Sequence, residues 1–250
     1  MPGLDPPYLE PLLGIVFDLD GTLVTSRHDF ARMRRAVVEA AESFGVPSGV
    51  IGPGETVHAT MTSAHNALLA LRASEGTLYK FEAEANHRID VIEMEALPTV
   101  AARPGAAALL EELRRRDFRL GLLTRSSEAF CRAALARTGL TAFFPVLRTR
   151  SAPGPAKPSP EALQILLREM GVPPHRAVVV GDHPMDGETA RGARVRFYGL
   201  LPEPPLAAGA MTLDRLKTAG ATAVARNLAE LARQLGLPPL PGVALPAEGG

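Results

Sequence analysis

The stretch Gly14-Ile-Val-Phe-Asp18-Leu-Asp20-Gly-Thr-Leu23 decides the fold class, because a short apolar run ends there at an acidic loop. An apolar run without polar alternation predicts a buried strand of a parallel sheet. Asp18 and Asp20 lie two residues apart at the exit of this strand, so the loop can aim both carboxylates at one point. Gly21 permits tight backbone geometry next to a ligand.

The remainder of the chain alternates between strand-like and helix-like segments, except in one block. After Pro98, strands are expected at 118–124, 144–147, 177–181, 194–200 and 221–225, and helices at 104–116, 126–138 with Ser126 as N-cap, 160–171, 186–191, 212–219 and 227–235. This alternation predicts an α/β fold with a doubly wound, Rossmann-like parallel sheet.

Residues 26–98 interrupt that pattern. Helical spacing recurs there at 29–44, 55–72 and 78–95, with no strand-like run between these segments. We therefore expect a core made of residues 1–25 and 99–240, a helical insert at 26–98 and a loosely ordered tail at 241–250.

Composition limits the classes of partner. The 250 residues carry a formal net charge of zero, which gives no global attraction to nucleic acid or an anionic membrane. No apolar run approaches the ~20 residues of a membrane span, and the N-terminus does not resemble a secretory signal. A single cysteine, Cys131, permits no internal disulfide. These features predict a cytoplasmic protein without nucleic-acid or membrane partners.

Polar residues follow several of the predicted strands. In doubly wound sheets, ligands bind beyond the carboxyl ends of the strands, so Asp18, Asp20, Thr124 and Asp182 should converge. Two adjacent carboxylates repel, which separates their pKa values and allows one to stay ionised while the other carries a proton. Asp-x-Asp-Gly also occurs in calcium loops, but the further ligands of an EF-hand are missing here.

Two other segments suit an anion. Thr124 and Arg125 precede a predicted helix start, where a hydroxyl and free N–H groups favour anion binding, although such a junction can equally be a simple cap. Lys157 lies between prolines in a chain that otherwise uses arginine; its ammonium would neutralise phosphoryl oxygens, and the alternative is a solvated loop charge.

The segment Gly181-Asp182-His-Pro-Met-Asp186 follows another apolar run. Two carboxylates close to Asp18 would form an oxygen-rich site of the kind that Mg²⁺ prefers. Asp186 can alternatively serve only as the N-cap of a helix.

In this order, Asp-x-Asp-Gly-Thr, Thr124, Lys157 and Gly-Asp-x-x-x-Asp resemble the motif set of the haloacid dehalogenase superfamily. The resemblance covers about residues 14–200 and is closest to phosphatases of the phosphoglycolate-phosphatase type, with a helical cap inserted after the first motif. One departure is the Pro- and Gly-rich loop before Lys157, which leaves open how far that side chain reaches.

The resemblance implies a role for each matching residue. Asp18 corresponds to the nucleophile and Asp20 to the general acid and base. Thr124 and Lys157 correspond to the phosphate-holding pair, and Arg125 is a further substrate-binding candidate. The implied Mg²⁺ ligands are the carboxylates of Asp18 and Asp182 with the carbonyl of Asp20. Asp186 is implied to stabilise these ligands without binding the ion directly.

The implied activity is Mg²⁺-dependent hydrolysis of a small phosphorylated metabolite through a phospho-aspartate on Asp18. A dehalogenase of the family would lack the carboxylate at Asp20. Two alternatives stay open, a phosphomutase with the same core residues and a non-catalytic binding module on the same fold. Neither the substrate nor the oligomeric state can be derived from the sequence.

Overall fold

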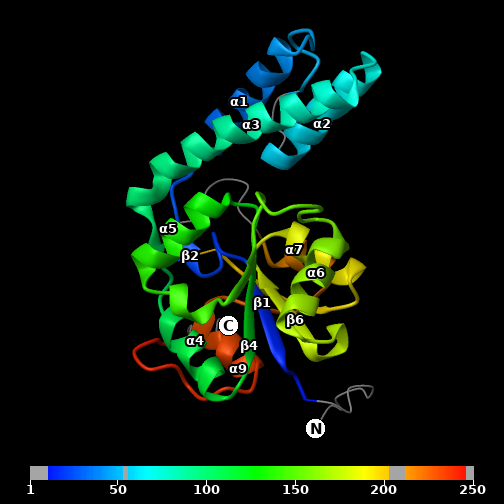
Figure 1. The fold of residues 1–250 in the computed structure, drawn as a ribbon. Coiled ribbons are helices and arrows are strands. Elements are labelled where there is room, and N and C mark those ends of the chain that lie inside the picture. The colour runs from blue at the N-terminus through cyan, green and yellow to red at the C-terminus, as the bar shows by residue number, and fades with distance from the viewer. Residues whose placement is uncertain (1–10, 53–55, 203–211, 246–250) are drawn as a thin grey trace. The chain divides into compact units, whose positions relative to one another are not determined.

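A computed structural model describes residues 11–52, 56–202 and 212–245. It divides into two compact units (Figure 1). One contains Arg27–Thr99, and the other contains the chain before Arg27 and after Thr99.

The larger unit is built on a six-stranded sheet in which every pairing is parallel. The strand order is β5-β4-β1-β6-β7-β8. The strands are β1 (Gly14–Phe17), β4 (Arg119–Leu123), β5 (Val146–Arg148), β6 (Ala177–Gly181), β7 (Arg196–Leu200) and β8 (Ala221–Ala225). After β1 the chain builds β4 and β5 on one side and then returns to build β6 to β8 on the other. The switch point of the sheet therefore lies at β1 and β6, where ligand sites are expected.

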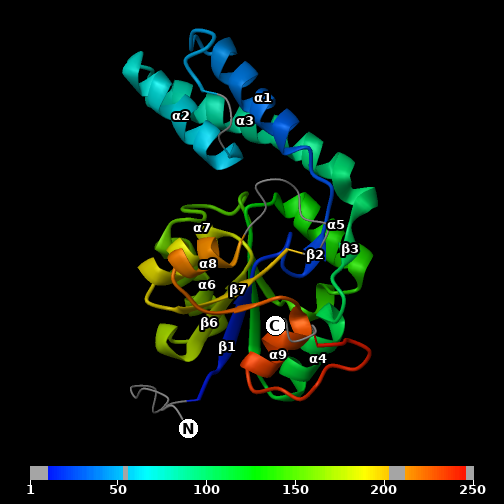
Figure 2. The same cartoon turned by 180° about the vertical axis from the view of Figure 1, so that it is seen from behind.

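Helices cover both faces of this sheet (Figures 1 and 2). One face carries α4 (Ala106–Arg115), α5 (Glu128–Thr138) and α9 (Leu228–Gln234), and the other carries α6 (Pro160–Met170), α7 (Pro184–Gly192) and α8 (Leu213–Thr218). Short 3₁₀ turns occupy Leu97–Thr99, Thr141–Phe143 and Pro174–Arg176. Side chains of α6 such as Leu163 and Leu166 share a buried core with Val16 of β1 and Val179 of β6. The predicted doubly wound α/β fold is confirmed.

Some local predictions were wrong. The N-cap of α5 is Ser127, whose Oγ accepts from the N–H of Phe130. Ser126 was expected there, but its own N–H donates to the Thr124 hydroxyl, so it belongs to the preceding turn. Sequence periodicity also missed the antiparallel pair β2 (Val24–Thr25) and β3 (Ala101–Ala102), because two residues per strand give no periodic signal.

The smaller unit consists of α1 (Phe30–Ser43), α2 (Val57–Ala70) and α3 (Glu75–Ala96). They enclose their own core, which includes Val37, Leu68 and Phe81. Helix α3 begins three residues before its expected start because Ser74 caps it, accepting from the N–H of Thr77.

The C-terminal segment, as far as it is described, packs against the rest of the larger unit. Asn227 donates its side-chain amide to the carbonyl of Ala244, and Val243 lies against Gly105. The remainder of the predicted loose tail, residues 246–250, lies outside the described residues. Among the described helices, none is both long and apolar enough for a bilayer span.

Candidate active site

The exit of β1 forms the floor of the site. The N–H of Asp18 donates to the carbonyl of Val180 at 2.9 Å, so the ladder between β1 and β6 continues up to the first acidic residue. Gly21 follows with φ of +84°, and a Cβ there would collide with the carboxylate of Asp182. Only glycine therefore lets the loop after β1 pass so close to the residue that follows β6.

The exit of β6 brings in two further carboxylates. The Oδ1 of Asp182 accepts from the hydroxyl of Thr22 at 2.8 Å. His183 then caps α7 in a capping box, in which its N–H donates to Oδ2 of Asp186 at 3.1 Å. Burial lowers the pKa of His183, whose Nδ1 accepts from the N–H of Met185. Asp186 is thereby fixed, buried, beneath the strand exit.

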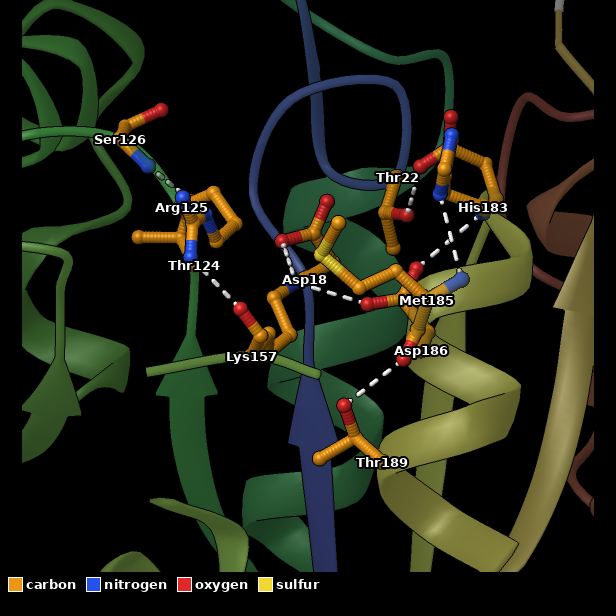
Figure 3. A network of polar contacts seen from close by, with 11 residues as sticks. Asp18, Thr22, Thr124, Arg125, Ser126, Lys157, His183, Met185, Asp186 and Thr189 are labelled. Carbon is orange, nitrogen blue, oxygen red and sulfur yellow. Dashed lines mark hydrogen bonds and ion pairs between the residues drawn. The ribbon is translucent and has the colours of Figure 1, made fainter. Parts of the chain in front are cut away.

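Lys157 joins the two strand exits (Figure 3). Its Nζ donates to Oδ1 of Asp18 at 2.5 Å and to Oδ1 of Asp186 at 2.7 Å. The ammonium is buried, with 4% of its side chain exposed. Burial alone would lower the pKa of Lys157, but the carboxylates of Asp18 and Asp186 together raise it above its usual value. The lysine therefore remains charged. The Pro- and Gly-rich loop does deliver Lys157 to the predicted site.

Asp18, Asp182 and Asp186 together form what we call the carboxylate cluster. Each offers an oxygen that lies within 4.8 Å of those of the other two. Burial, with further repulsion from Asp186, raises the pKa of Asp18 to about 7 in spite of Lys157. Burial and the charge of Asp18 raise the pKa of Asp182 well above its usual range. The negative charge of the cluster is therefore only partly compensated by Lys157.

This donor set fits a hard divalent cation. The three side chains present only carboxylate oxygens, which are the ligands that Mg²⁺ and Ca²⁺ select. A cation would also offset the repulsion between these carboxylates, which adds to the effect of burial in raising the pKa values of Asp18 and Asp182. The side chain of Asp20 is not a member of the cluster.

Asp20, in the loop after β1, and Thr124, directly after β4, have their own hydrogen-bond partners. Oδ1 of Asp20 accepts from the hydroxyl of Ser26 at 2.7 Å. The Thr124 hydroxyl is buried and accepts from the N–H of Ser126 at 3.1 Å. Arg125 donates through Nη1 to the carbonyl of Lys157 at 2.7 Å, so this contact holds the lysine loop (Figure 3).

Sequence reasoning assigned no role to several residues that shape the site. Thr22 and Ser26 hydrogen-bond two of the acidic residues, and the first of them was visible only as part of the Asp-x-Asp-Gly-Thr motif. Arg103 is fully buried and donates to the carbonyls of Gly21 and Leu201. Nothing in the local sequence distinguishes this arginine from an exposed one.

Comparison with known proteins identifies the family. The family model described as haloacid dehalogenase-like hydrolase matches residues 12–194. A phosphoglycolate phosphatase of Cupriavidus necator is 30% identical over 236 residues, which are 89% of this chain and 97% of that protein. Protein CbbY of Cereibacter sphaeroides is 31% identical over 190 residues, 73% of this chain and 81% of that protein.

Solved structures share the fold at lower identity. A hydrolase from Pseudomonas syringae superposes with a TM-score of 0.63 at 21% identity, covering 90% of this chain and 98% of that one. CbbY from Rhodobacter sphaeroides in complex with phosphate gives 0.59 at 24% identity, covering 90% and 100%. The extent of the family match and the similarity to the curated relatives confirm the predicted resemblance. The chain belongs to the haloacid dehalogenase-like hydrolase family, and it is an enzyme of the phosphatase type within that family.

Proposed function

We propose that this protein hydrolyses a small phosphomonoester of the phosphoglycolate type, through a phospho-aspartate on Asp18. The observation that carries the proposal is the position of Asp18. It lies at the switch point of the sheet, hydrogen-bonded to a buried ammonium and grouped with two further carboxylates. A carboxylate held in this way is suited to act as a nucleophile toward phosphorus.

In the first step, an oxygen of Asp18 attacks phosphorus and the bond from phosphorus to the ester oxygen breaks. The carboxylic acid of Asp20 donates its proton to the departing oxygen, which leaves as an alcohol. The hydrogen bond from Ser26 orients Asp20 for this transfer. Lys157 keeps its charge beside Asp18 and stabilises the negative charge of the transferring group.

In the second step, water attacks the phosphorus of the aspartyl phosphate. The Asp20 carboxylate accepts the proton of this water, and the bond from phosphorus to the Asp18 oxygen breaks. Inorganic phosphate leaves, and Asp18 and protonated Asp20 are restored. Thr124 and Lys157 are proposed to hold the phosphoryl oxygens during both steps.

We assign a Mg²⁺ site to the carboxylates of Asp18 and Asp182 and the carbonyl of Asp20, with Asp186 as a supporting group. When bound, Mg²⁺ supplies a Lewis acid for the phosphoryl oxygens. The three carboxylates, each with an oxygen within 4.8 Å of those of the other two, support this assignment because they offer only oxygen donors. Thr22 orients Asp182 for it.

The substrate class rests on the relatives. Several of them, about 30% identical, are named phosphoglycolate phosphatase. The helical unit Arg27–Thr99 occupies the place of a cap in the chain order, between β2 and β3, and we propose that it selects the substrate. The single cysteine supports the proposed cytoplasmic location.

The test is phosphate release from 2-phosphoglycolate, sugar phosphates and p-nitrophenyl phosphate, with Mg²⁺ and with chelator. We expect Mg²⁺-dependent release that is fastest with phosphoglycolate, and a loss of at least about a thousandfold in Asp18→Asn. Sugar phosphates isomerised without release of phosphate would instead indicate a mutase. An Asp18→Asn variant as fast as the parent would disprove the proposed nucleophile.

A further inference from the structure

The loop that carries Lys157 has an unusual composition. Residues 153–158 read Pro-Gly-Pro-Ala-Lys-Pro, so three of the six have no N–H group. Such a loop can form few backbone hydrogen bonds of its own, and its carbonyl groups need donors from elsewhere. Nevertheless Lys157 is held firmly enough to reach two carboxylates at once. Donors from outside the loop are therefore needed to define its conformation.

Arg148, the last residue of β5, supplies those donors. Its guanidinium is buried, and it donates through Nε and Nη2 to the carbonyl of Pro155 at 3.3 and 3.1 Å. Nη2 also donates to the carbonyl of Pro153. Between these two prolines, Gly154 has φ of +85°, and a Cβ added to it would lie 3.4 Å from Nη2 of Arg148. The planar fork of the guanidinium thus fixes the loop two residues before Lys157.

The main chain of Arg148 is connected to the other predicted phosphate-holding residue. Its carbonyl accepts from the N–H of Thr124 at 3.0 Å, and Leu123 pairs with it in the sheet. Arg125, next to Thr124, donates to the carbonyl of Lys157. One residue therefore links the end of β4 to the loop of the catalytic ammonium.

We propose that Arg148 is a positioning residue for Lys157: it replaces the backbone donors that the prolines lack and thereby keeps the ammonium between Asp18 and Asp186. This inference rests on the proposed function for its effect on catalysis, but its effect on the location of Lys157 can be measured without any substrate.

The chain offers internal references for that measurement, because it has only three lysines, at 80, 157 and 217. Lys80 and Lys217 are exposed, whereas Lys157 is 3% exposed. Brief acetylation with acetic anhydride, followed by mass spectrometry, compares the reactivity of the three amines. In the parent, Lys157 should react at least about tenfold more slowly than the other two, because it is buried and remains an ammonium ion.

A control with the same chemistry exists at the opposite end of the sheet. Arg119, the first residue of β4, donates through Nη1 to the carbonyls of Met170 and Gly171, and it too lies against a left-handed glycine. Unlike Arg148, it is exposed and remote from the strand exits. Arg148→Met and Arg119→Met therefore both remove hydrogen bonds from a guanidinium to backbone carbonyls, and only the first should affect Lys157.

We expect Arg148→Met to expose Lys157 to acetylation at a rate close to that of Lys80, and to lower kcat for p-nitrophenyl phosphate about tenfold to a hundredfold. Arg148→Lys should be intermediate, because one ammonium cannot reproduce the fork. Arg119→Met should match the parent in both respects. If Arg148→Met does not fold, as judged by circular dichroism and gel filtration, the comparison of Arg148→Lys with the parent decides.

A folded Arg148 variant in which Lys157 stays as protected as in the parent would overturn the inference, as would an equal exposure of Lys157 in Arg119→Met. Failure of the proposed function gives a different result: Lys157→Met would then release phosphate as fast as the parent. Acetylation of the Arg148 and Arg119 variants would still report on the position of Lys157.

Discussion

Without divalent cations, the protein should become less stable as the pH rises from about 4 to about 7. Burial next to Asp186 raises the pKa of Asp18 from 3.8 to about 7, and Lys157 opposes this only in part. Because the folded state then holds this proton more tightly than the unfolded chain, the contribution to stability is complete below about 3.8. It is lost as the pH rises through the pKa of the folded state.

The size of the effect follows from that difference in pKa. About three pH units correspond to about 4 kcal/mol in the free energy of unfolding. Only 12% of the Asp18 side chain is exposed, so solvent screens the effect little. In Asp18→Asn the titrating group is absent, and so is the repulsion between the Asp18 and Asp182 carboxylates. The variant should therefore gain up to about 4 kcal/mol relative to the parent between pH 4.5 and 8.

The assay is urea unfolding of both proteins in chelator across this pH range. Circular dichroism is the appropriate signal, since the chain has no tryptophan. Saturating Mg²⁺ should abolish most of the divergence, because the cation neutralises the cluster. A stability difference between parent and variant that stays constant with pH within about 1 kcal/mol would refute the view that Asp18 is a buried, charge-repelled carboxylate.

Three further substitutions test separate parts of the site. Asp20→Asn should slow phosphate release about 10²- to 10⁴-fold and leave calorimetric Mg²⁺ binding nearly unchanged, because this side chain lies outside the carboxylate cluster; abolished Mg²⁺ binding would contradict its assignment. Gly181→Ala should destabilise the protein by about 1–3 kcal/mol, since a Cβ would collide with the carboxylate of Asp186. The control Gly76→Ala, whose Cβ in α3 would meet only the Ser74 hydroxyl at an ordinary contact distance of 3.9 Å, should be neutral or stabilising by up to about 1 kcal/mol; an equal loss of stability in both variants on thermal unfolding would contradict the steric explanation. Thr22→Val removes a hydrogen bond to the cluster and should weaken Mg²⁺ binding about tenfold in the same calorimetric assay, so an unchanged affinity would exclude a role for this hydroxyl.

The fold and the meeting of the acidic residues were predictable because they depend on a few strong rules. Apolar runs such as Ala177–Gly181 and Ala221–Ala225 gave strands with the bounds that the structure has. The rule that ligand sites lie beyond the carboxyl ends of parallel strands is sufficient to predict that Asp18 and Asp182 lie together. These signals are local in sequence, or they follow from the parallel topology alone.

The contacts that complete the site were not predictable, because they depend on side-chain conformations in three dimensions. Ser127 rather than Ser126 caps α5, because the N–H of Ser126 donates to the hydroxyl of Thr124 in the preceding turn. Arg148 at the end of β5 looks like an ordinary solvated arginine in the sequence. Its function becomes apparent only when the prolines it contacts, and their missing N–H groups, are seen around it.

The central claim is that Asp18 carries the phosphoryl group, and one measurement tests it directly. The Asp20→Asn variant with p-nitrophenyl phosphate should complete the first step, because p-nitrophenolate departs without a proton, and then stall for lack of a base. Rapid quenching with borohydride reduces an aspartyl phosphate to homoserine, which mass spectrometry locates. We predict a burst of about one p-nitrophenolate per enzyme and homoserine at position 18. Turnover without a burst and with an unmodified Asp18, or modification at another carboxylate, would contradict the account.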